Sequence, residues 1–191
     1  MIYLIDHQDS FTFNLAHLLA DFDEVYVSNY FEINKKKLHQ SSMVVFSPVP
    51  GEPKDYPKSS SIYLEIKGKK KILGICLGFQ QILFNEKGKI TQQKNIYHGF
   101  QSKIKVLNSS KLFKKNKFFT VGRYHSLKLH EPYNSKDIKI SMRCMLSNVA
   151  MGFEDHKNKI FGFQFHPESF LSLIHISEPT RPRLISYAVF C

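Results

Sequence analysis

The sequence predicts an α/β protein with an open, mostly parallel sheet flanked by helices and additional antiparallel strands in its second half. Three observations lead to this fold class. Short apolar runs rich in β-branched and aromatic residues alternate with helical patterns in the first half. Strand-like runs follow one another directly in the second half. The length of 191 residues and the hydrophobic content of 42% suit one globular domain.

The first half begins with a strand, a helix and two further strands. Residues 2–6 form an apolar run that predicts a buried strand. Apolar residues then recur at helical spacing over residues 10–22, with Asp9 and Ser10 as N-cap candidates. Residues 24–28 and 43–47 are predicted strands, and the second leads into the proline-rich segment SPVPGEP, which must be a loop. This order predicts parallel strands joined by crossover helices.

The rest of the chain is predicted to form one more helix and several further strands. Residues 72–76 form another apolar run that turns directly into a predicted helix over residues 77–84. Shorter strand-like runs then follow, separated by turn residues, at 103–107, 118–122, 138–141, 149–154 and 160–165. No internal repeat and no long polar linker divides the chain, so we expect a single domain.

The net charge of +11 raises the question of an anionic partner such as nucleic acid. Only four of the 27 basic residues are Arg, the lysines are scattered in short runs, and no stripe of Arg with interleaved aromatic residues is visible. Nucleic-acid readers tend to use Arg forks, so we interpret the charge as a solvated lysine surface and predict no nucleic-acid partner. No apolar stretch approaches the ~18 residues that a membrane-spanning helix needs, so no membrane association is expected.

The cysteine and histidine spacing indicates neither a disulfide framework nor a metal site. The three cysteines, Cys76, Cys144 and Cys191, lie far apart, and an odd number suits a reducing compartment. Because the first residues also lack the pattern of a signal peptide, we expect a cytoplasmic protein. No metal-ligand spacing such as H-E-x-x-H or C-x-x-C occurs among the nine histidines, so no metal is predicted.

The most informative motif is the segment Gly74-Ile75-Cys76-Leu77-Gly78 at a predicted strand-to-helix junction. Its form, G-x-C-x-G, matches the nucleophile elbow, where glycines flank the nucleophile because the turn is too sharp for side chains. The helix dipole favours a thiolate at Cys76, and the amide of Leu77 would point toward a developing oxyanion. The alternative is an ordinary buried cysteine of the core.

A base for this cysteine is offered by the segment GFQFHPES over residues 162–169. The predicted strand that ends at Phe165 delivers His166 to the carboxyl edge of the sheet. Pro167 directs the chain so that Glu168 can accept a hydrogen bond from the imidazole, as a base and its orienting group require. An ordinary loop histidine is the alternative, and the pair gains weight because a candidate nucleophile exists elsewhere in the chain.

Five ordered blocks over residues 1–169 together resemble the class I glutamine amidotransferases: IDHQDSFTFNL, SPVPGEP, GICLGFQ, RYHSL and GFQFHPES. More narrowly, they resemble the amidotransferase subunit of anthranilate synthase and 4-amino-4-deoxychorismate synthase. The resemblance implies an amidotransferase domain over residues 1–171 that hydrolyses L-glutamine to glutamate and ammonia. The ammonia would pass to a separate chorismate-binding synthase subunit, in tryptophan or folate biosynthesis, and this chain would need no cofactor.

The same resemblance implies a role for individual residues. Cys76, His166 and Glu168 would form a catalytic triad. The backbone amides of Gly51 and Leu77 would form the oxyanion hole. Glutamine would be bound by six residues, Val49, Pro50, Gly51, Gln80, Ser126 and Leu127.

The chain departs from the family pattern in the proline-rich loop. The usual sequence is P-G-P-G, and Val49 stands in place of the first glycine. A Cβ at this position could restrict the loop that supplies the Gly51 amide. Two alternatives to a glutaminase subunit therefore stay open: a catalytically impaired interaction subunit, and a stand-alone cysteine hydrolase that acts on a γ-glutamyl substrate without a synthase partner.

The end of the chain has a different composition from the rest. The resemblance stops near Phe170, the last lysine is Lys159, and two of the four arginines, Arg181 and Arg183, fall in the final residues. The segment also resembles translated sequencing-adapter read-through. We interpret residues 172–191 as an atypical tail of non-native sequence, a hypothesis that re-reading the genomic codons would test.

Overall fold

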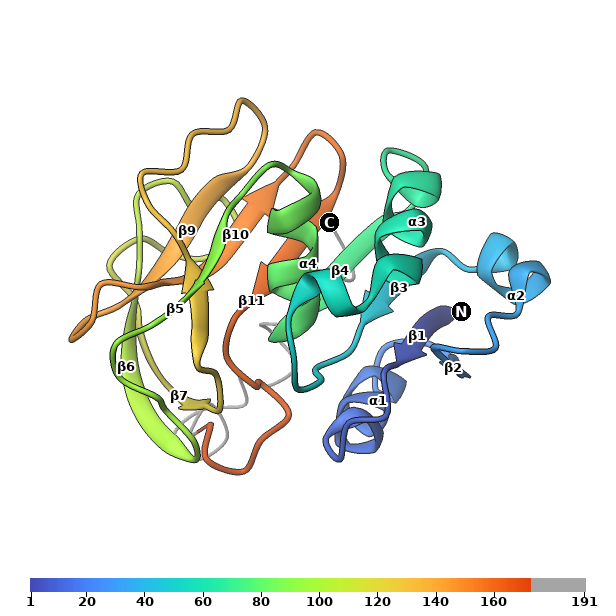
Figure 1. The fold of residues 1–191 in the computed structure, drawn as a ribbon, viewed down its shortest axis with the longest axis horizontal. Helices are drawn as coiled ribbons and strands as arrows, with labels where there is room; N and C mark the ends of the chain where they lie inside the picture. Colours follow the sequence, from blue (N-terminus) through green and yellow to red (C-terminus); the bar gives the residue numbers. More distant parts are fainter. Residues whose placement is uncertain (173–191) are drawn as a thin grey trace.

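The structure is a computed structural model that describes residues 1–172, and it centres on a large mixed sheet (Figure 1). In chain order its elements are β1 (Ile2–Asp6), α1 (Thr12–Ala20), β2 (Val25–Asn29), α2 (Lys35–Gln40), β3 (Met43–Phe46), a 3-10 turn (Pro53–Asp55), α3 (Pro57–Ile66), β4 (Lys71–Ile75), α4 (Leu77–Asn85), β5 (Ile90–Gln92), β6 (Phe100–Val106), β7 (Phe118–Arg123), β8 (Leu127–Leu129), β9 (Lys139–Cys144), β10 (Ala150–Asp155) and β11 (Ile160–Phe163).

The sheet has nine strands in the order β2-β1-β3-β4-β11-β10-β9-β6-β7. The five strands from β2 to β11 pair in parallel. The strands from β11 through β10, β9 and β6 to β7 pair antiparallel. This arrangement confirms the predicted fold class, a mostly parallel sheet in the first half with antiparallel strands in the second. A separate two-stranded sheet joins β5 and β8.

Helices cover both faces of the parallel strands because successive side chains of each strand point to opposite sides. One apolar cluster joins α1 to alternate residues of β1 and β3, namely Ile2, Leu4, Met43 and Val45. A second cluster joins α2, α3 and α4 to the intervening residues, namely Tyr3, Ile5, Val44 and Phe46. The continuous apolar runs seen in the sequence are therefore strands buried on both faces, as in other parallel sheets.

The start of α1 differs from the prediction. The helix begins at Thr12, and its N-cap position is Phe11, whose side chain makes no cap hydrogen bond. Asp9 instead accepts a hydrogen bond from the Phe11 amide at 2.8 Å, which closes a turn before the helix. The prediction of Asp9 or Ser10 as the N-cap was therefore wrong.

The helices α2 and α3 and the short strands β5 and β8 were not predicted from the sequence. α2 buries only Leu38, and α3 carries three consecutive serines, so neither shows a strong apolar stripe. Each still has a local start signal: the Asn34 side chain accepts from the Lys37 amide at 3.0 Å, and Pro57 occupies the first turn of α3. The predicted strand over 160–165 ends at Phe163, the strand over 2–6 has the predicted bounds, and the bounds of the other predicted strands differ by at most three residues.

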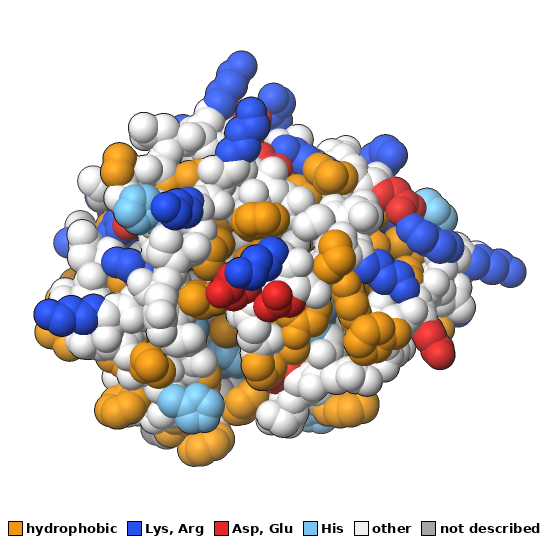
Figure 2. Space-filling view, viewed as in Figure 1, with side chains coloured by type: hydrophobic (Ala, Val, Ile, Leu, Met, Phe, Trp, Pro, Cys, Tyr) orange, Lys and Arg blue, Asp and Glu red, His pale blue; other side chains and the backbone are white. Residues whose placement is uncertain are grey.

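Lysine and arginine side chains are spread over the face shown in Figure 2, with apolar and uncharged areas between them. This distribution agrees with a solvated lysine surface. Among residues 1–172, no helix combines the length and the apolar character needed to cross a bilayer. Apart from Ser172, the tail predicted to be non-native lies outside the described residues.

Two glycines allow α4 to pack directly against the sheet. A Cβ on Gly78 would lie 2.4 Å from the Phe46 carbonyl oxygen, and one on Gly74 would lie 2.5 Å from the backbone of Gly78. Both contacts are with backbone atoms, which cannot rotate away. The glycines therefore set the distance between β3, β4 and α4, and so the position of the residue at the junction of β4 and α4, Cys76.

We expect Gly78→Ala to lower the free energy of unfolding by about 3 kcal/mol, because the methyl group overpacks a contact between backbone atoms. Gly68→Ala is the control: its Cβ would meet nothing closer than 3.8 Å, although Gly68 has a φ of +73°. That substitution has only a backbone cost of about 1 kcal/mol. Urea denaturation measures both, and equal losses would contradict the close-packing argument.

Candidate functional site

Cys76 occupies a strained turn between β4 and α4. Its φ of 52° and ψ of −103° lie in a region that side chains other than glycine rarely adopt. The Cys76 amide donates to the Phe163 carbonyl at 2.8 Å, which ties the turn to the end of β11. Because β4 and β11 are adjacent parallel strands, their carboxyl ends bring Cys76 and the segment after Phe163 to the same edge of the sheet.

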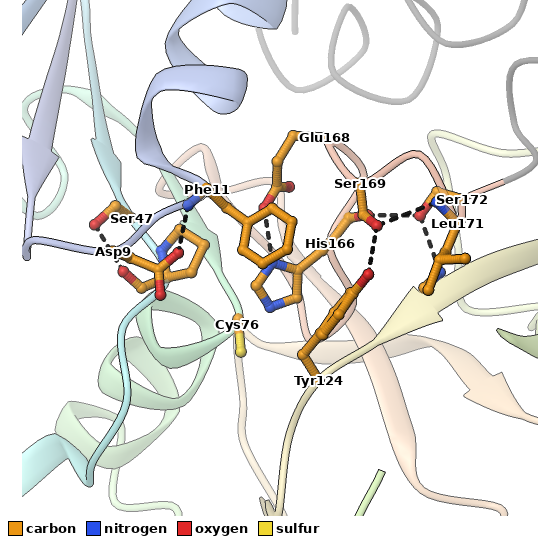
Figure 3. A network of polar contacts seen from close by, with 12 residues as sticks. Asp9, Phe11, Ser47, Cys76, Tyr124, His166, Glu168, Ser169, Leu171 and Ser172 are labelled. Carbon is orange, nitrogen blue, oxygen red and sulfur yellow. Dashed lines mark hydrogen bonds and ion pairs between the residues drawn. The ribbon is translucent and has the colours of Figure 1, made fainter. Parts of the chain in front are cut away.

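His166 and Glu168 form a buried pair at this edge (Figure 3). The His166 Nδ1 lies 2.7 Å from Glu168 Oε1, and the two residues are 3% and 2% exposed. The His166 amide donates to the Gly122 carbonyl at 3.1 Å, so β7 also holds the segment. Within the described residues Nε2 of His166 makes no hydrogen bond, and Figure 3 shows Cys76 beside the imidazole.

The charge state of His166 follows from its neighbours. Burial by itself would lower the pKa of His166, but the negative charge of Glu168 and the adjacent Cys76 sulfur outweigh burial. Together they hold the pKa of His166 well above its usual value. The geometry therefore favours an imidazolium that faces the cysteine sulfur.

Two aromatic rings enclose the His166 imidazole. The ring of Phe11 lies 5.1 Å away and that of Tyr124 lies 5.0 Å away, between ring centroids. The Tyr124 hydroxyl is hydrogen-bonded to Ser169 at 2.9 Å. Sequence reasoning missed both rings, although they belong to the blocks IDHQDSFTFNL and RYHSL. They fix the plane of the imidazole and restrict water around it.

Ser172, the last described residue, also holds the segment around His166 in place. Its hydroxyl donates to the His166 carbonyl at 2.5 Å and accepts from the Gly122 amide at 2.9 Å. Ser172 is fully buried. The chain is therefore integrated into the fold up to this residue.

A cavity of about 60 Å³ opens next to Cys76. All six residues predicted to bind glutamine line it, together with Cys76, Leu77, Tyr124 and His125: Val49, Pro50, Gly51, Gln80, Ser126 and Leu127. A larger cavity of about 440 Å³ shares part of this lining and adds residues from the start of the chain, Asp9, Ser10 and Phe11, as well as His98 and His166. The structure thus brings every predicted site residue except Glu168 to these two cavities, and Glu168 lies behind His166.

The proline-rich loop places Gly51 at the cavity in a conformation that requires glycine. Gly51 has a φ of +107°, and a Cβ there would lie 3.1 Å from Asp55 Oδ2. The Tyr56 hydroxyl donates to the Pro50 carbonyl at 2.8 Å and holds the loop in place. Val49 is not among the residues with positive φ, so its backbone is compatible with a side chain. Leu77 is the first residue of α4, where amides have no partner within the helix.

The described residues 1–172 contain no group of three or more His, Cys, Asp or Glu that could hold a metal ion. The arrangement at the sheet edge consists instead of a thiol, an imidazole and a carboxylate in sequence, beside a polar cavity. Such an arrangement can carry out nucleophilic acyl transfer, with the cysteine as nucleophile and the histidine as proton carrier.

Comparison with known proteins identifies the class of protein. The family model described as glutamine amidotransferase class-I matches residues 3–177. The chain therefore belongs to the class I glutamine amidotransferase family. A solved structure of a glutamine amidotransferase from Thermotoga maritima has the same fold, with a TM-score of 0.69 and 20% identity over 87% of this chain and 75% of that one.

Two curated relatives give a narrower position within the family. The chain is 34% identical to anthranilate synthase component 2 of Lactococcus lactis subsp. lactis, over 88% of this chain and 86% of the relative. It is 36% identical to anthranilate synthase component 2 of Thermococcus kodakarensis, over 90% of this chain and 89% of the relative.

Two further histidines near the site, His7 and His125, are buried and neutral. His7 follows β1 and lies 3.0 Å from the Ser47 hydroxyl and 2.7 Å from the Ser59 hydroxyl, which joins β1, β3 and α3. Burial lowers the pKa of His7 to about 4, despite the nearby carboxylate of Asp6. Burial and then the charge of Arg123 lower the pKa of His125 to about 3.

These shifts predict a loss of stability in mild acid. The unfolded chain takes up protons below pH 6.5, whereas folded His7 and His125 stay neutral until about pH 4 and 3, so their contribution is complete above pH 6.5 and lost as the pH falls. We expect the free energy of unfolding to fall by about 2 kcal/mol per histidine between pH 7 and 5.

Urea denaturation at several pH values measures this loss. His7→Asn should flatten the pH dependence, and His17→Asn, a substitution of an exposed histidine, serves as the comparison. An identical pH dependence in His7→Asn and the wild type would contradict a neutral buried His7.

Proposed function

We propose that this chain is a glutaminase subunit that hydrolyses L-glutamine to glutamate and ammonia and delivers the ammonia to a chorismate-binding synthase subunit. The observation that carries the proposal is the placement of Cys76 in a strained elbow beside His166, whose other ring nitrogen is paired with Glu168. The lining of the adjacent cavity by all six expected glutamine contacts supports the choice of substrate.

The reaction begins with proton transfer between the catalytic groups. Transfer of the Cys76 proton to Nε2 of His166 gives a thiolate and the imidazolium that the site favours, and the thiolate attacks the carboxamide carbon of glutamine. The amides of Gly51 and Leu77 stabilise the oxyanion that forms. The carbon–nitrogen bond then breaks, the leaving nitrogen takes the proton from His166, and ammonia and a γ-glutamyl thioester result.

Water completes the reaction. His166 removes a proton from a water molecule, whose oxygen attacks the thioester carbon. The carbon–sulfur bond breaks, the Cys76 sulfur recovers the proton, and glutamate is released. Glu168 accepts the Nδ1 hydrogen bond throughout and stabilises the imidazolium of the charged intermediates.

The partner and the product are inferred from the relatives. Both are named component 2 of anthranilate synthase, which favours a heteromer in which this chain supplies ammonia for amination of chorismate. Because anthranilate and 4-amino-4-deoxychorismate synthases share this type of subunit, pairing the chain with each partner and identifying the product as ortho or para aminated distinguishes tryptophan from folate biosynthesis.

Two alternative functions give different results in the same assays. A catalytically impaired interaction subunit would release no glutamate in the presence of the synthase partner. The conformation of Val49 and Gly51 argues against impairment by the altered loop. A stand-alone γ-glutamyl hydrolase would release glutamate without co-purifying with a chorismate-binding chain.

Cys76→Ala tests the central assignment. We expect glutamine-dependent synthesis in the reconstituted complex to fall by about 10⁴-fold or more, because no other described group at the site can form the thioester. Ammonia-dependent synthesis in the same complex should be unchanged, since only ammonia production is lost. Retained glutamine-dependent activity would exclude Cys76 as the nucleophile.

Glu168→Gln tests the orienting group through its effect on pH dependence. The Glu168 carboxylate helps to raise the pKa of His166 above its usual value, so its removal lowers that pKa and the imidazolium is lost at lower pH. The alkaline limb of the glutaminase kcat profile should therefore move to lower pH, and kcat should fall by about 10³-fold.

The raised pKa of His166 also affects the stability of the folded chain. A raised pKa in the folded state stabilises the fold below the unfolded value of about 6.5, and this contribution is lost as the pH rises through the folded pKa. Glutamate release measured across pH in both proteins provides the check. An alkaline limb that does not move in Glu168→Gln would contradict the charge coupling between Glu168 and His166.

A further inference from the structure

Arg123, at the end of β7, is a buried cation without a carboxylate partner. It is fully buried, and no acidic side chain of residues 1–172 forms an ion pair with it. Its guanidinium carbon lies 3.8 Å from the centroid of the Tyr97 ring. Its terminal nitrogens donate to Gln93 Oε1 at 3.3 Å and to the Cys144 sulfur at 3.4 Å. Burying a charge in this way is costly.

The Nε–H donor of Arg123 determines which nitrogen of His125 carries the proton. The Nε–H of Arg123 donates to Nε2 of His125 at 3.1 Å. A guanidinium has only donors, so Nε2 must be the bare nitrogen. A neutral imidazole has one N–H, which must then be on Nδ1. That nitrogen lies 2.8 Å from the carbonyl oxygen of Leu127 and donates to it.

Leu127 belongs to the wall of the cavity beside Cys76. Its carbonyl oxygen also accepts from Nε2 of Gln80 at 3.4 Å. The same Gln80 nitrogen donates to Gln164 at 3.0 Å, and Gln164 reaches the Cys76 carbonyl at 3.4 Å. A continuous chain of buried and partly buried hydrogen bonds thus runs from Arg123 through His125, Leu127, Gln80 and Gln164 to the backbone of Cys76.

Gln93 braces the same segment from the other side. Its amide nitrogen donates to the Ser126 carbonyl at 2.9 Å. Its side-chain Nε2 donates to the His125 carbonyl and lies 3.3 Å from His125 Nδ1, which as an N–H does not accept from it, and its Oε1 accepts from Arg123. Since Arg123 can only donate, the orientation of the Gln93 amide is determined as well. The backbone of residues 125–127 is therefore held by donors on several sides.

We propose that Arg123 and His125 are positioning residues for the glutamine pocket: Arg123 imposes the Nδ1–H tautomer on His125, and His125 holds the Leu127 carbonyl and with it the wall formed by Ser126 and Leu127. The inference rests on the proposed glutaminase function. This role explains why Arg123 is buried without an acidic partner. Neither a lysine nor a neutral side chain would present several N–H donors in the same fixed planar arrangement.

The tautomer is stable over the working range of pH. Burial, followed by the positive charge of Arg123, lowers the pKa of His125 to about 3. His125 therefore stays neutral, and its single proton stays on Nδ1. This contrasts with His166, whose pKa is raised by Glu168 and Cys76 despite burial.

The tautomer can be measured directly in the full chain. Long-range ¹H–¹⁵N spectra of the ¹⁵N-histidine-labelled protein distinguish Nδ1–H from Nε2–H, and the signal of His125 is the one missing in His125→Asn. We expect Nδ1–H in the wild type and loss of this preference in Arg123→Met, which removes the donors without leaving a charge. Nε2–H in the wild type, or an unchanged tautomer in Arg123→Met, would overturn the proposal.

Two substitutions of His125 test its effect on glutamine binding in the complex with the synthase. In His125→Asn the amide nitrogen takes the position of Nδ1 and retains a donor for Leu127. In His125→Gln the longer side chain retains an acceptor for Arg123 but places no donor at Nδ1. We expect KM for glutamine to rise about tenfold in His125→Gln, with kcat within about threefold, and His125→Asn to stay close to the wild type.

Both variants lack the imidazole. A difference in their KM for glutamine therefore arises from the donor at the position of Nδ1 and not from a general loss of packing. Similar thermal midpoints confirm that both remain folded. Equal KM values in the two variants, or a loss confined to kcat, would overturn the positioning role. If the wild-type complex releases no glutamate, the proposed function itself fails, whereas the tautomer measurement still decides whether Arg123 sets the proton of His125.

Discussion

The close approach of α4 to β3 and β4 is the constraint on which the rest of the site depends. It is possible because Gly74 and Gly78 have no side chains where backbone atoms nearly touch. The contact forces the chain through the sharp turn at Cys76 with its unfavourable backbone angles. The packing of two buried apolar clusters against the sheet offsets the free-energy cost of these strained backbone angles. The Cys76 sulfur is held at the sheet edge because the core behind it is tightly packed.

The site uses buried histidines in two opposite charge states. His166 faces a carboxylate and a cysteine sulfur, which favour its protonated form despite burial. His125 faces Arg123, and His7 faces two serine hydroxyls, so burial keeps both neutral. The same residue type can therefore be a charged imidazolium in one place and a neutral hydrogen-bond partner in another. The difference arises from the partner of each ring nitrogen and not from the degree of burial.

Local patterns in the chain were sufficient for much of the fold. The doubly buried strands appear as continuous apolar runs, and the elbow glycines follow from the sharp turn that they permit. α2 and α3 could not be found in the same way, because one buries a single leucine and the other is rich in serine. Their stability comes from packing against the sheet, which no local pattern reports. The N-cap of α1 was misplaced because Asp9 closes a turn with its own side chain instead of capping the helix.

The amino-acid sequence by itself determined the candidate nucleophile, its base and the orienting carboxylate, because their spacing within short motifs constrains local geometry: only Pro167 separates His166 from Glu168, and glycines flank Cys76. Only the tertiary structure decided how these motifs meet and which residues support them. Phe11 comes from the start of the chain and reaches His166 only in the folded protein, as does Tyr124 directly after β7. The contacts of Arg123 with Gln93, Tyr97 and Cys144 likewise join distant parts of the chain. Contacts between residues far apart in the chain leave no periodic signal, whereas turns and short-range hydrogen bonds do.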